Sequence, residues 1–255
     1  MASRTSGRLG KWLVSGPPLR YLLVFFAVPT LIMALASFRT PGEFGGLAPL
    51  VDEMGALDLN VDSYARLVAE PVYAQVFLKS VWYALLTTLA CLALAYPLAA
   101  LIARSAKRYR NLLLLLVILP FWSNFLIRIY AWMIILGPQA ALARSVNGIL
   151  AALGMEPVSL LFSSFAVLAC LVYVHLPFMV LPLYANLEKH DQALLDAAQD
   201  LGASAWQRFW RITFPLSLPG VYAGAALVFI PALGMFAIPD ILGGPEDSLI
   251  GNVIK

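Results

Sequence analysis

Five long apolar stretches constrain this sequence more than any other feature. Each is close to the roughly 20 apolar residues that a helix needs to cross the hydrocarbon layer of a membrane. Because lipid offers the backbone no hydrogen-bonding partners, such segments fold as helices. We therefore expect an all-α, polytopic membrane helix bundle. Its expected spans are Leu19–Phe38, Val76–Ala103, Leu112–Leu136, Val158–Ala185 and Pro219–Ile241.

The composition supports a membrane protein. Of the 255 residues, 61% are hydrophobic and only 12% are charged. A water-soluble domain of this length could not remove so much apolar surface from water, so lipid is the expected neighbour of much of the chain. Cys91 and Cys170 both fall inside expected spans, far from any other potential ligand, which predicts neither a disulfide nor a metal site.

The distribution of charge predicts an orientation. Lys and Arg gather in the amino-terminal tail and in the turn after the second span, and such residues are enriched on the cytoplasmic side of membranes. The loop from Arg39 to Gln75 is acidic and is therefore expected outside. The same alternation places residues 186–218 in the cytoplasm. The cationic residues are Arg4, Arg8, Lys11 and Arg20 in the tail, and Arg104, Lys107, Arg108 and Arg110 in the turn.

The first span has an alternative interpretation. The tripeptide Ala34-Leu35-Ala36 resembles a signal-peptide cleavage site. The apolar run is longer than the hydrophobic region of a usual signal peptide, which favours an uncleaved anchor. We expect a multi-pass protein with a cytoplasmic amino terminus.

Residues 196–215 form a polar segment between two apolar spans. Leu194, Ala198, Leu201, Ala205 and Phe209 recur at helical spacing and would form one apolar stripe. Gly202 interrupts this helix, so we expect two short helices that meet near it and present a compact surface to a partner. The alternative is an amphipathic helix lying on the lipid surface, but the Lys- and Arg-rich face typical of such helices is missing.

The same segment resembles a known signature. Asp196-Ala197-Ala198, Gly202, Ile212 and Phe214-Pro215 are spaced as in the E-A-A-x-x-x-G-x(9)-I-x-L-P motif of ABC importer permeases. Asp196 stands in place of Glu, and Phe214 in place of Leu. The resemblance implies that this cytoplasmic loop docks onto an ATPase subunit. The docking residues it implies are Asp196, Ala197, Ala198, Gly202, Ile212 and Pro215.

Other stretches resemble the spermidine/putrescine permeases in particular. They cover roughly residues 80–255 and include Leu119–Trp122 with Ile127–Trp132, Leu176–Ala185, Pro215–Val221, Phe229–Gly234 and Ile238–Gly244. The resemblance implies a type I ABC importer permease of the bacterial inner membrane. It also implies two ATPase subunits that bind ATP and Mg²⁺, a second permease subunit and an external solute-binding protein. No cofactor is expected on this chain, and nothing indicates a nucleic-acid partner.

Hydropathy and charge, together with the resemblance over residues 80–255, divide the chain into three regions. Residues 1–18 are the expected cytoplasmic tail, 19–75 the first span and the external acidic loop, and 76–255 the permease core with a docking loop at about 186–218. Two departures stand out. Such permeases usually have six spans, so the five here suggest a carboxy-terminal truncation or a short member. Met235 stands where many relatives carry Glu, which weakens the expectation of a polyamine.

The candidate translocation path combines aromatic and polar residues of the third to fifth spans. Aromatic faces can attract an ammonium ion. Arg128 is costly at membrane depth unless it is paired or reaches water, so it could line the path, pair with Asp240 or extend toward the interface. The candidates are Trp122, Asn124, Arg128, Trp132, Tyr173, Phe236 and Asp240.

We therefore expect a permease subunit of an ATP-driven importer for polyamines or a related small amine. A zwitterionic or neutral solute is the alternative, and a membrane scaffold or receptor that does not transport is another. No P-loop or catalytic motif such as HExxH or G-x-S-x-G occurs in the sequence, so we expect no enzymatic activity on this chain.

Overall fold

The computed structural model describes residues 14–39 and 60–254, and its regular elements in these ranges are all helices. Five helical stretches are long and apolar enough to cross a membrane, which confirms the expected all-α bundle with five spans. They are Val14–Ala36, Pro71–Arg104, Phe125–Ala152, Ser164–Leu187 and Ala205–Leu233. The chain forms two compact units, Met1–Pro71 and Val72–Lys255.

The first unit contains the first membrane helix, which is described from Val14. It widens into a π-turn at η1 (Leu23–Ala27) and continues as α2 (Val28–Ala36). Pro29 follows this turn and lacks the N–H that a regular helix would use, which accounts for the widening. The short helix α3 (Asp62–Ala69) packs its Tyr64 ring on Phe38, with centroids 5.3 Å apart. Most of the expected acidic loop lies outside the described residues.

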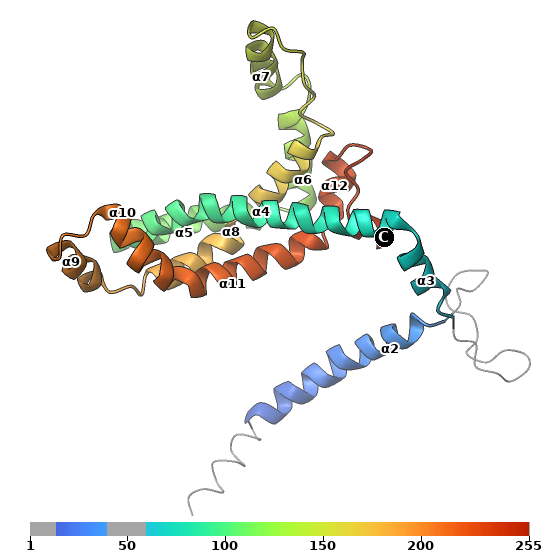
Figure 1. Ribbon diagram of the computed structural model, residues 1–255, viewed down its shortest axis with the longest axis horizontal. Coiled ribbons are helices and arrows are strands. Elements are labelled where there is room, and N and C mark those ends of the chain that lie inside the picture. The colour runs from blue at the N-terminus through green and yellow to red at the C-terminus, as the bar shows by residue number, and fades with distance from the viewer. Residues whose placement is uncertain (1–13, 40–59, 255) are drawn as a thin grey trace, which may run out of the picture. The chain divides into compact units, whose positions relative to one another are not determined.

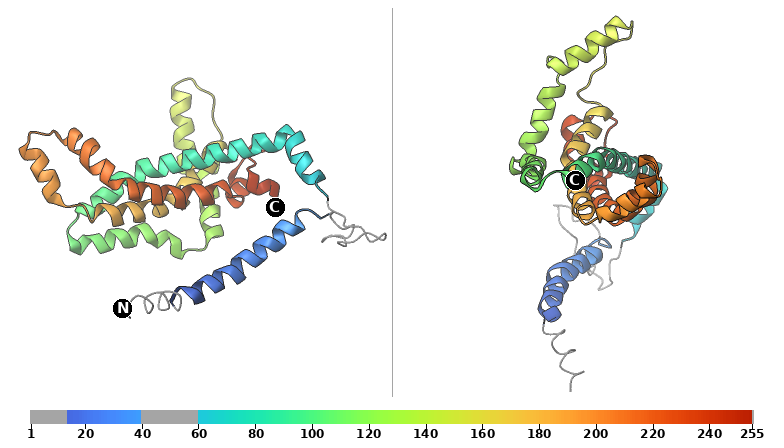
Figure 2. Two further views of the ribbon diagram at one scale, coloured as in Figure 1. Left: turned by 60° about the horizontal axis from the view of Figure 1, so that its bottom comes forward. Right: turned by 90° about the vertical axis from the view of Figure 1, so that its left-hand side faces the viewer.

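The second unit is built around three long helices. They are α4 (Pro71–Arg104), α8 (Ser164–Leu187) and α11 (Phe214–Leu233), which run alongside one another in Figures 1 and 2. The helix α5 (Lys107–Ile118) turns back along them after Arg104. The buried face of α4 consists largely of small side chains, which lets its backbone lie close to its neighbours. They include Ala84, Cys91, Ala95 and Ala99.

The tightest packing joins α8 to α11. Gly220 and Gly224 lie one turn apart on α11 and leave no room for side chains. A Cβ atom on Gly220 would lie 2.8 Å from the Asn186 Cβ, and one on Gly224 would lie 2.6 Å from the Met179 sulfur. Paired small residues at this spacing let membrane helices approach closely. These two helices therefore form one closely packed pair.

The expectation of one continuous helix over Leu112–Leu136 was wrong. The chain breaks into α5, the 3₁₀-helix η2 (Leu119–Trp122) and α6 (Phe125–Leu136). Pro120 supplies no N–H at the break, and the Asn124 side chain caps α6 by accepting from the Leu126 N–H at 2.9 Å. After a turn at 137–140, α7 (Ala141–Ala152) follows and projects beyond the packed helices in Figure 1.

The fifth expected span, Pro219–Ile241, is also interrupted. The helix α11 ends with its C-cap at Gly234, and a separate short helix, α12 (Ala237–Leu242), follows. Glycine lowers the stability of a continuing helix, which explains a stop that hydropathy alone does not predict. The described chain ends in α13 (Ile250–Ile254). In Figure 1, α12 lies at the opposite end of α11 from α9 and α10.

Candidate functional site

The segment that resembles the docking loop forms two short helices. The first is α9 (Gln192–Asp200), capped by the Asp191 carboxylate, which accepts from the Ala193 N–H at 3.0 Å. Gly202 follows with a φ of +79°, a left-handed conformation that glycine adopts without steric cost. The chain therefore reverses at Gly202. The apolar stripe expected on one helix is divided between two.

The second helix, α10 (Ala205–Arg208), is set by a capping box. The Ser204 hydroxyl accepts from the Gln207 N–H, and the Gln207 side chain accepts from the Ser204 N–H at 2.9 Å. The helix then widens into the π-turn η3 (Phe209–Thr213) before α11. Pro215 cannot donate to the Arg211 carbonyl, which accounts for the wider turn. We call residues 191–213 the docking segment.

The docking segment exposes apolar side chains. Leu201 is 88% exposed and Trp206 is 70% exposed. Asp196 and Ala197 are also exposed, whereas Ala198 and Ile212 are half-buried. Trp206 also belongs to an aromatic cluster with Phe209, Trp210 and Phe214, whose neighbouring ring centroids are 5.1–6.4 Å apart. The geometry is that of a rigid apolar projection which a protein partner can cover.

An ion pair lies just before the docking segment. The Arg110 guanidinium contacts the Glu188 carboxylate at 2.5 Å and also donates to the Ala103 carbonyl at the end of α4. Hydrogen bonding to Tyr184, together with the nearby Arg110, holds the pKa of Glu188 below its usual range. Because Glu188 directly follows α8, this pair joins the ends of three helices.

The opposite end of the bundle contains a buried carboxylate that sequence reasoning missed. The Asp247 carboxylate accepts from Tyr83 Oη at 2.8 Å, Ser164 Oγ at 2.6 Å and the Gly244 N–H at 3.0 Å. Lys79 Nζ lies 3.9 Å away. Desolvation opposes ionisation of Asp247, but these hydrogen bonds and the cation outweigh it and hold its pKa below the ordinary value. In the sequence, Asp247 belongs to a polar turn with no recognisable spacing.

The candidate path residues of the third span lie around the break in the helix. Trp122 is 75% exposed, and Asn124 serves as the cap of α6. The Arg128 guanidinium lies 4.9 Å from the Phe121 ring centroid and 5.8 Å from that of Phe125. The Arg128 Nε and Nη1 atoms are buried without a hydrogen-bond partner. Cation–π contacts therefore hold this charge.

The structure brings the remaining candidates together in pairs. Trp132 and Tyr173 meet edge to face, with centroids 5.6 Å apart. Phe236 and Asp240 both contact the Asn252 amide, which donates to the Phe236 carbonyl and to the Asp240 carboxylate. Asp240 lines a cavity of about 500 Å³. Among the described residues, no ion pair joins Arg128 to Asp240.

The site offers no set of metal ligands in residues 14–39 and 60–254. Cys91 and Cys170 are buried free thiols on α4 and α8. What the arrangement supports is binding: the docking segment offers an exposed apolar surface at one end, and aromatic and acidic groups lie toward the other.

Comparisons with known proteins agree with this arrangement. The family described as "Binding-protein-dependent transport system inner membrane component" matches residues 95–254. The chain is 45% identical over 237 residues to the spermidine/putrescine transport system permease protein PotB of Salmonella typhimurium, covering 92% of this chain and 78% of that protein. The Escherichia coli PotB is also 45% identical, with 82% of its length covered. The inner membrane ABC transporter permease protein YdcU of Escherichia coli is 30% identical over 203 residues, covering 74% of this chain and 63% of that protein.

A solved structure shares the fold. A chain from the bacterial ABC transporter that imports the acidic polysaccharide alginate superposes with a TM-score of 0.69 at 21% identity, over 97% of this chain and 86% of that one. A second structure of an alginate transporter, in complex with its alginate-bound periplasmic protein, gives a TM-score of 0.64 at 19% identity, over 99% of this chain and 85% of that one. The profile match and the identity to these permeases establish that this chain belongs to the family of binding-protein-dependent transport system inner membrane components.

Proposed function

We propose that this chain is a permease subunit of an ATP-driven importer that moves spermidine, putrescine or a related polyamine across the inner membrane. The observation that carries this proposal is 45% identity to a spermidine/putrescine permease across 92% of the chain. The matched region covers 237 residues, so it extends over the spans as well as the docking segment.

We further propose that the docking segment binds an ATPase subunit. Its support is geometric: Asp196, Ala197 and Leu201 are exposed on a short helix whose end is set by Gly202. ATP and Mg²⁺ would bind to that partner. A second permease subunit and an external solute-binding protein would complete the importer. ATP must bind the two conformations unequally for its hydrolysis to drive transport.

The proposed path runs past the aromatic and acidic groups of α6, α8 and α12. Trp132 and Tyr173 offer π-faces to an ammonium group, and Asp240 offers a negative charge at a cavity. The contact of Arg128 with Phe121 holds the positive charge against an aromatic ring. This arrangement leaves Asp240 as the attracting charge for a cationic solute.

Cysteine labelling tests the orientation, with the amino terminus and the docking segment in the cytoplasm. In a variant whose buried Cys91 and Cys170 are replaced by Ala, single cysteines replace Gln199 or the exposed Glu156. We expect an impermeant reagent to label position 156 and not 199 in intact cells, and both in open membranes. Labelling of position 199 in sealed cells would reverse the orientation.

A transport assay tests the substrate. The chain is expressed with its ATPase, second permease and binding protein in cells that lack polyamine uptake, and labelled spermidine, putrescine and a zwitterionic amino acid are offered separately. We expect uptake of the amines alone. Uptake of the zwitterion instead would favour the alternative solute class. ATP hydrolysis without uptake of any solute would favour the alternative of a membrane scaffold or receptor that does not transport.

A further inference from the structure

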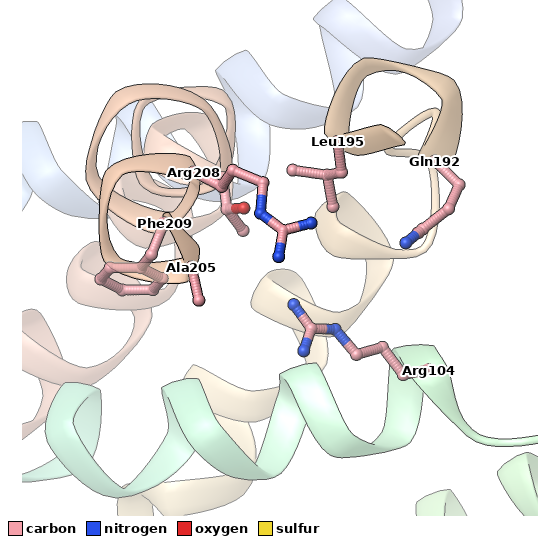
Figure 3. A pocket seen from close by; sticks show the side chains of 7 residues that line it. Arg104, Gln192, Leu195, Ala205, Arg208 and Phe209 are labelled. Carbon is pink, nitrogen blue, oxygen red and sulfur yellow. The ribbon is translucent and has the colours of Figure 1, made fainter. Parts of the chain in front are cut away.

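A cavity beside the docking segment is lined by two arginines. It has a volume of about 360 Å³ and lies between the end of α4 and the helices α9 and α10. Figure 3 shows Arg104 reaching in from α4 and Arg208 from α10, with their guanidinium groups facing each other. Gln192 and Leu195 of α9 line the same space.

Neither of these two cations forms an ion pair within residues 14–39 and 60–254; Glu188, which lines an adjoining cavity with Arg104, is paired with Arg110. The ion pairs of this part of the chain join Lys79 to Asp247 and Arg110 to Glu188. Arg208 donates to the neutral Gln199 side chain at 2.6 Å, and its Nε is buried without a hydrogen-bond partner. Two guanidinium groups that face each other repel, and each offers donors suited to the oxygens of a phosphate. The cavity therefore fits an anion.

An apolar groove leads away from this cavity. Its volume is about 460 Å³, and its lining is almost entirely apolar. The groove runs along α4 from Leu92 to Arg104, a distance of about 18 Å at the helical rise. Phe209 and Phe214 form its other wall, and Arg104, Phe209 and Thr213 line both spaces. Hydrogen-bond donors suited to an anion and an apolar groove thus form one continuous surface.

The length of α4 allows this surface to lie at the level of lipid headgroups. The helix α4 has 34 residues, so it extends about 51 Å, whereas the hydrocarbon core of a membrane is about 30 Å thick. Arg104 is its last residue, next to the basic turn. A free phosphate ion would leave the apolar groove empty, whereas a phospholipid would fill both parts. Basic pockets between membrane helices on the cytoplasmic side are known to bind anionic lipid headgroups.

We propose that Arg104 and Arg208 bind the phosphate of an anionic phospholipid whose acyl chain lies in the groove between α4 and the η3–α11 wall. Arg208 belongs to the docking segment, so the bound lipid links that segment to α4. Binding itself does not depend on the proposed transport function. Its effect on the coupling of ATP hydrolysis to transport does rest on that function, because the anionic lipid would hold α10 in place for the ATPase.

The test measures lipid retained by the purified transporter. The complex is reconstituted into nanodiscs of phosphatidylcholine with or without phosphatidylglycerol, released, and examined by native mass spectrometry. We expect retained phosphatidylglycerol, reduced about tenfold by Arg104→Gln or Arg208→Gln, because each removes charge-assisted hydrogen bonds. Arg211→Gln removes the same charge from an exposed position outside both linings and should leave retention unchanged.

A second pair of variants tests the groove. Ala93 lines it, whereas its exposed neighbour Leu94 does not. Ala93→Trp should fill the slot and reduce retention, and Leu94→Trp should not. Arg208→Lys should restore part of the retention lost in Arg208→Gln. Gel filtration of each complex checks that the variants remain folded.

Four outcomes would overturn the proposal. Equal retention of phosphatidylcholine and phosphatidylglycerol would show that the cavity does not select an anionic lipid. Displacement of the bound species by inorganic phosphate alone would indicate a free-phosphate site. Loss of the ATPase from the arginine variants, with lipid retention unchanged, would indicate that the cavity binds a carboxylate of the ATPase. Loss of the second permease from Ala93→Trp would indicate that the groove binds that subunit. Failure of uptake with lipid retention intact would count against the transport function and not against the lipid site.

Discussion

The Tyr83 hydroxyl donates a 2.8 Å hydrogen bond to the Asp247 carboxylate across a sequence separation of 164 residues. This bond ties the loop after α12 to the first half of α4. Ser164 adds the beginning of α8 to the same carboxylate. A single buried acid therefore joins three parts of the chain that hydropathy treats as unrelated.

Replacing this acid should lower stability. Asp247→Asn removes the charge that strengthens three hydrogen bonds, and hydrogen bonds to charged groups contribute about 1.5–3 kcal/mol each. We expect a clear loss of thermal stability in the purified transporter. Glu246→Gln removes a neighbouring charge whose side chain is exposed, and it is the matched control. Equal melting temperatures for the two variants would contradict this role.

The effect of Asp247→Asn should depend on pH. The pKa of Asp247 is lowered in the folded protein, so its stabilisation is fully present above the unfolded pKa and is lost as pH falls through the folded value. The stability difference between the wild type and Asp247→Asn should therefore be constant near neutral pH and shrink in acid. Thermal unfolding across a pH series measures it. A difference that grows in acid would have the wrong sign.

Gly202 should be required for docking. A β-branched side chain at a φ of +79° is strained even though no neighbour lies within 4 Å of the added Cβ. We expect Gly202→Val to insert in the membrane but to lose the ATPase or its substrate-stimulated hydrolysis. Gly154→Val imposes the same strain at a φ of +73° outside the docking segment and should retain coupling. Normal hydrolysis and uptake in Gly202→Val would contradict the docking assignment.

Gly224 should be required for the packing of α8 against α11. Gly224→Leu forces a side chain onto Met179, and overpacking of this kind costs about 1–3 kcal/mol. Gly148→Leu, at a helical position with open space, should be neutral. Truncation of the partner in Gly224→Leu/Met179→Ala should recover part of the lost stability. No recovery, or an equal loss in Gly148→Leu, would count against direct packing.

The effect of Asp240 on uptake should increase with the positive charge of the solute. Asp240→Asn removes the acid that lines a cavity, and we expect the loss of uptake to be greater for spermidine than for putrescine, which carries less charge, each normalised to membrane-inserted protein. Ser248→Ala changes the lining of the same cavity without a change of charge and is the control. Unchanged normalised uptake would remove Asp240 from the path and favour a neutral or zwitterionic solute.

The sequence predicts the number and type of spans because hydropathy over about 20 residues reports directly on lipid burial. It does not locate the breaks at Ser123–Asn124 and Gly234. Each depends on a local competition between helix continuation and a cap or a glycine, while the flanking residues remain apolar. The bend at Gly202 was predictable because a glycine interrupts a clear helical pattern.

The Asp247 network and the arginine cavity were beyond sequence reasoning for a different reason. Tyr83 and Asp247, like Arg104 and Arg208, become neighbours only when α4 lies beside the later helices. Neither pair has a spacing that indicates contact. Lone polar residues near membrane spans have many possible roles, and only packing selects among them.

The close contact of Gly220 and Gly224 with α8 bears on how force passes through the protein. The docking segment begins after α8 and ends where α11 starts, so both of its ends are attached to helices that cannot slide apart without opening that contact. If the docking segment binds an ATPase subunit as proposed, a displacement of that segment acts on both helices at once, and we expect α8 and α11 to move as a pair because of this contact.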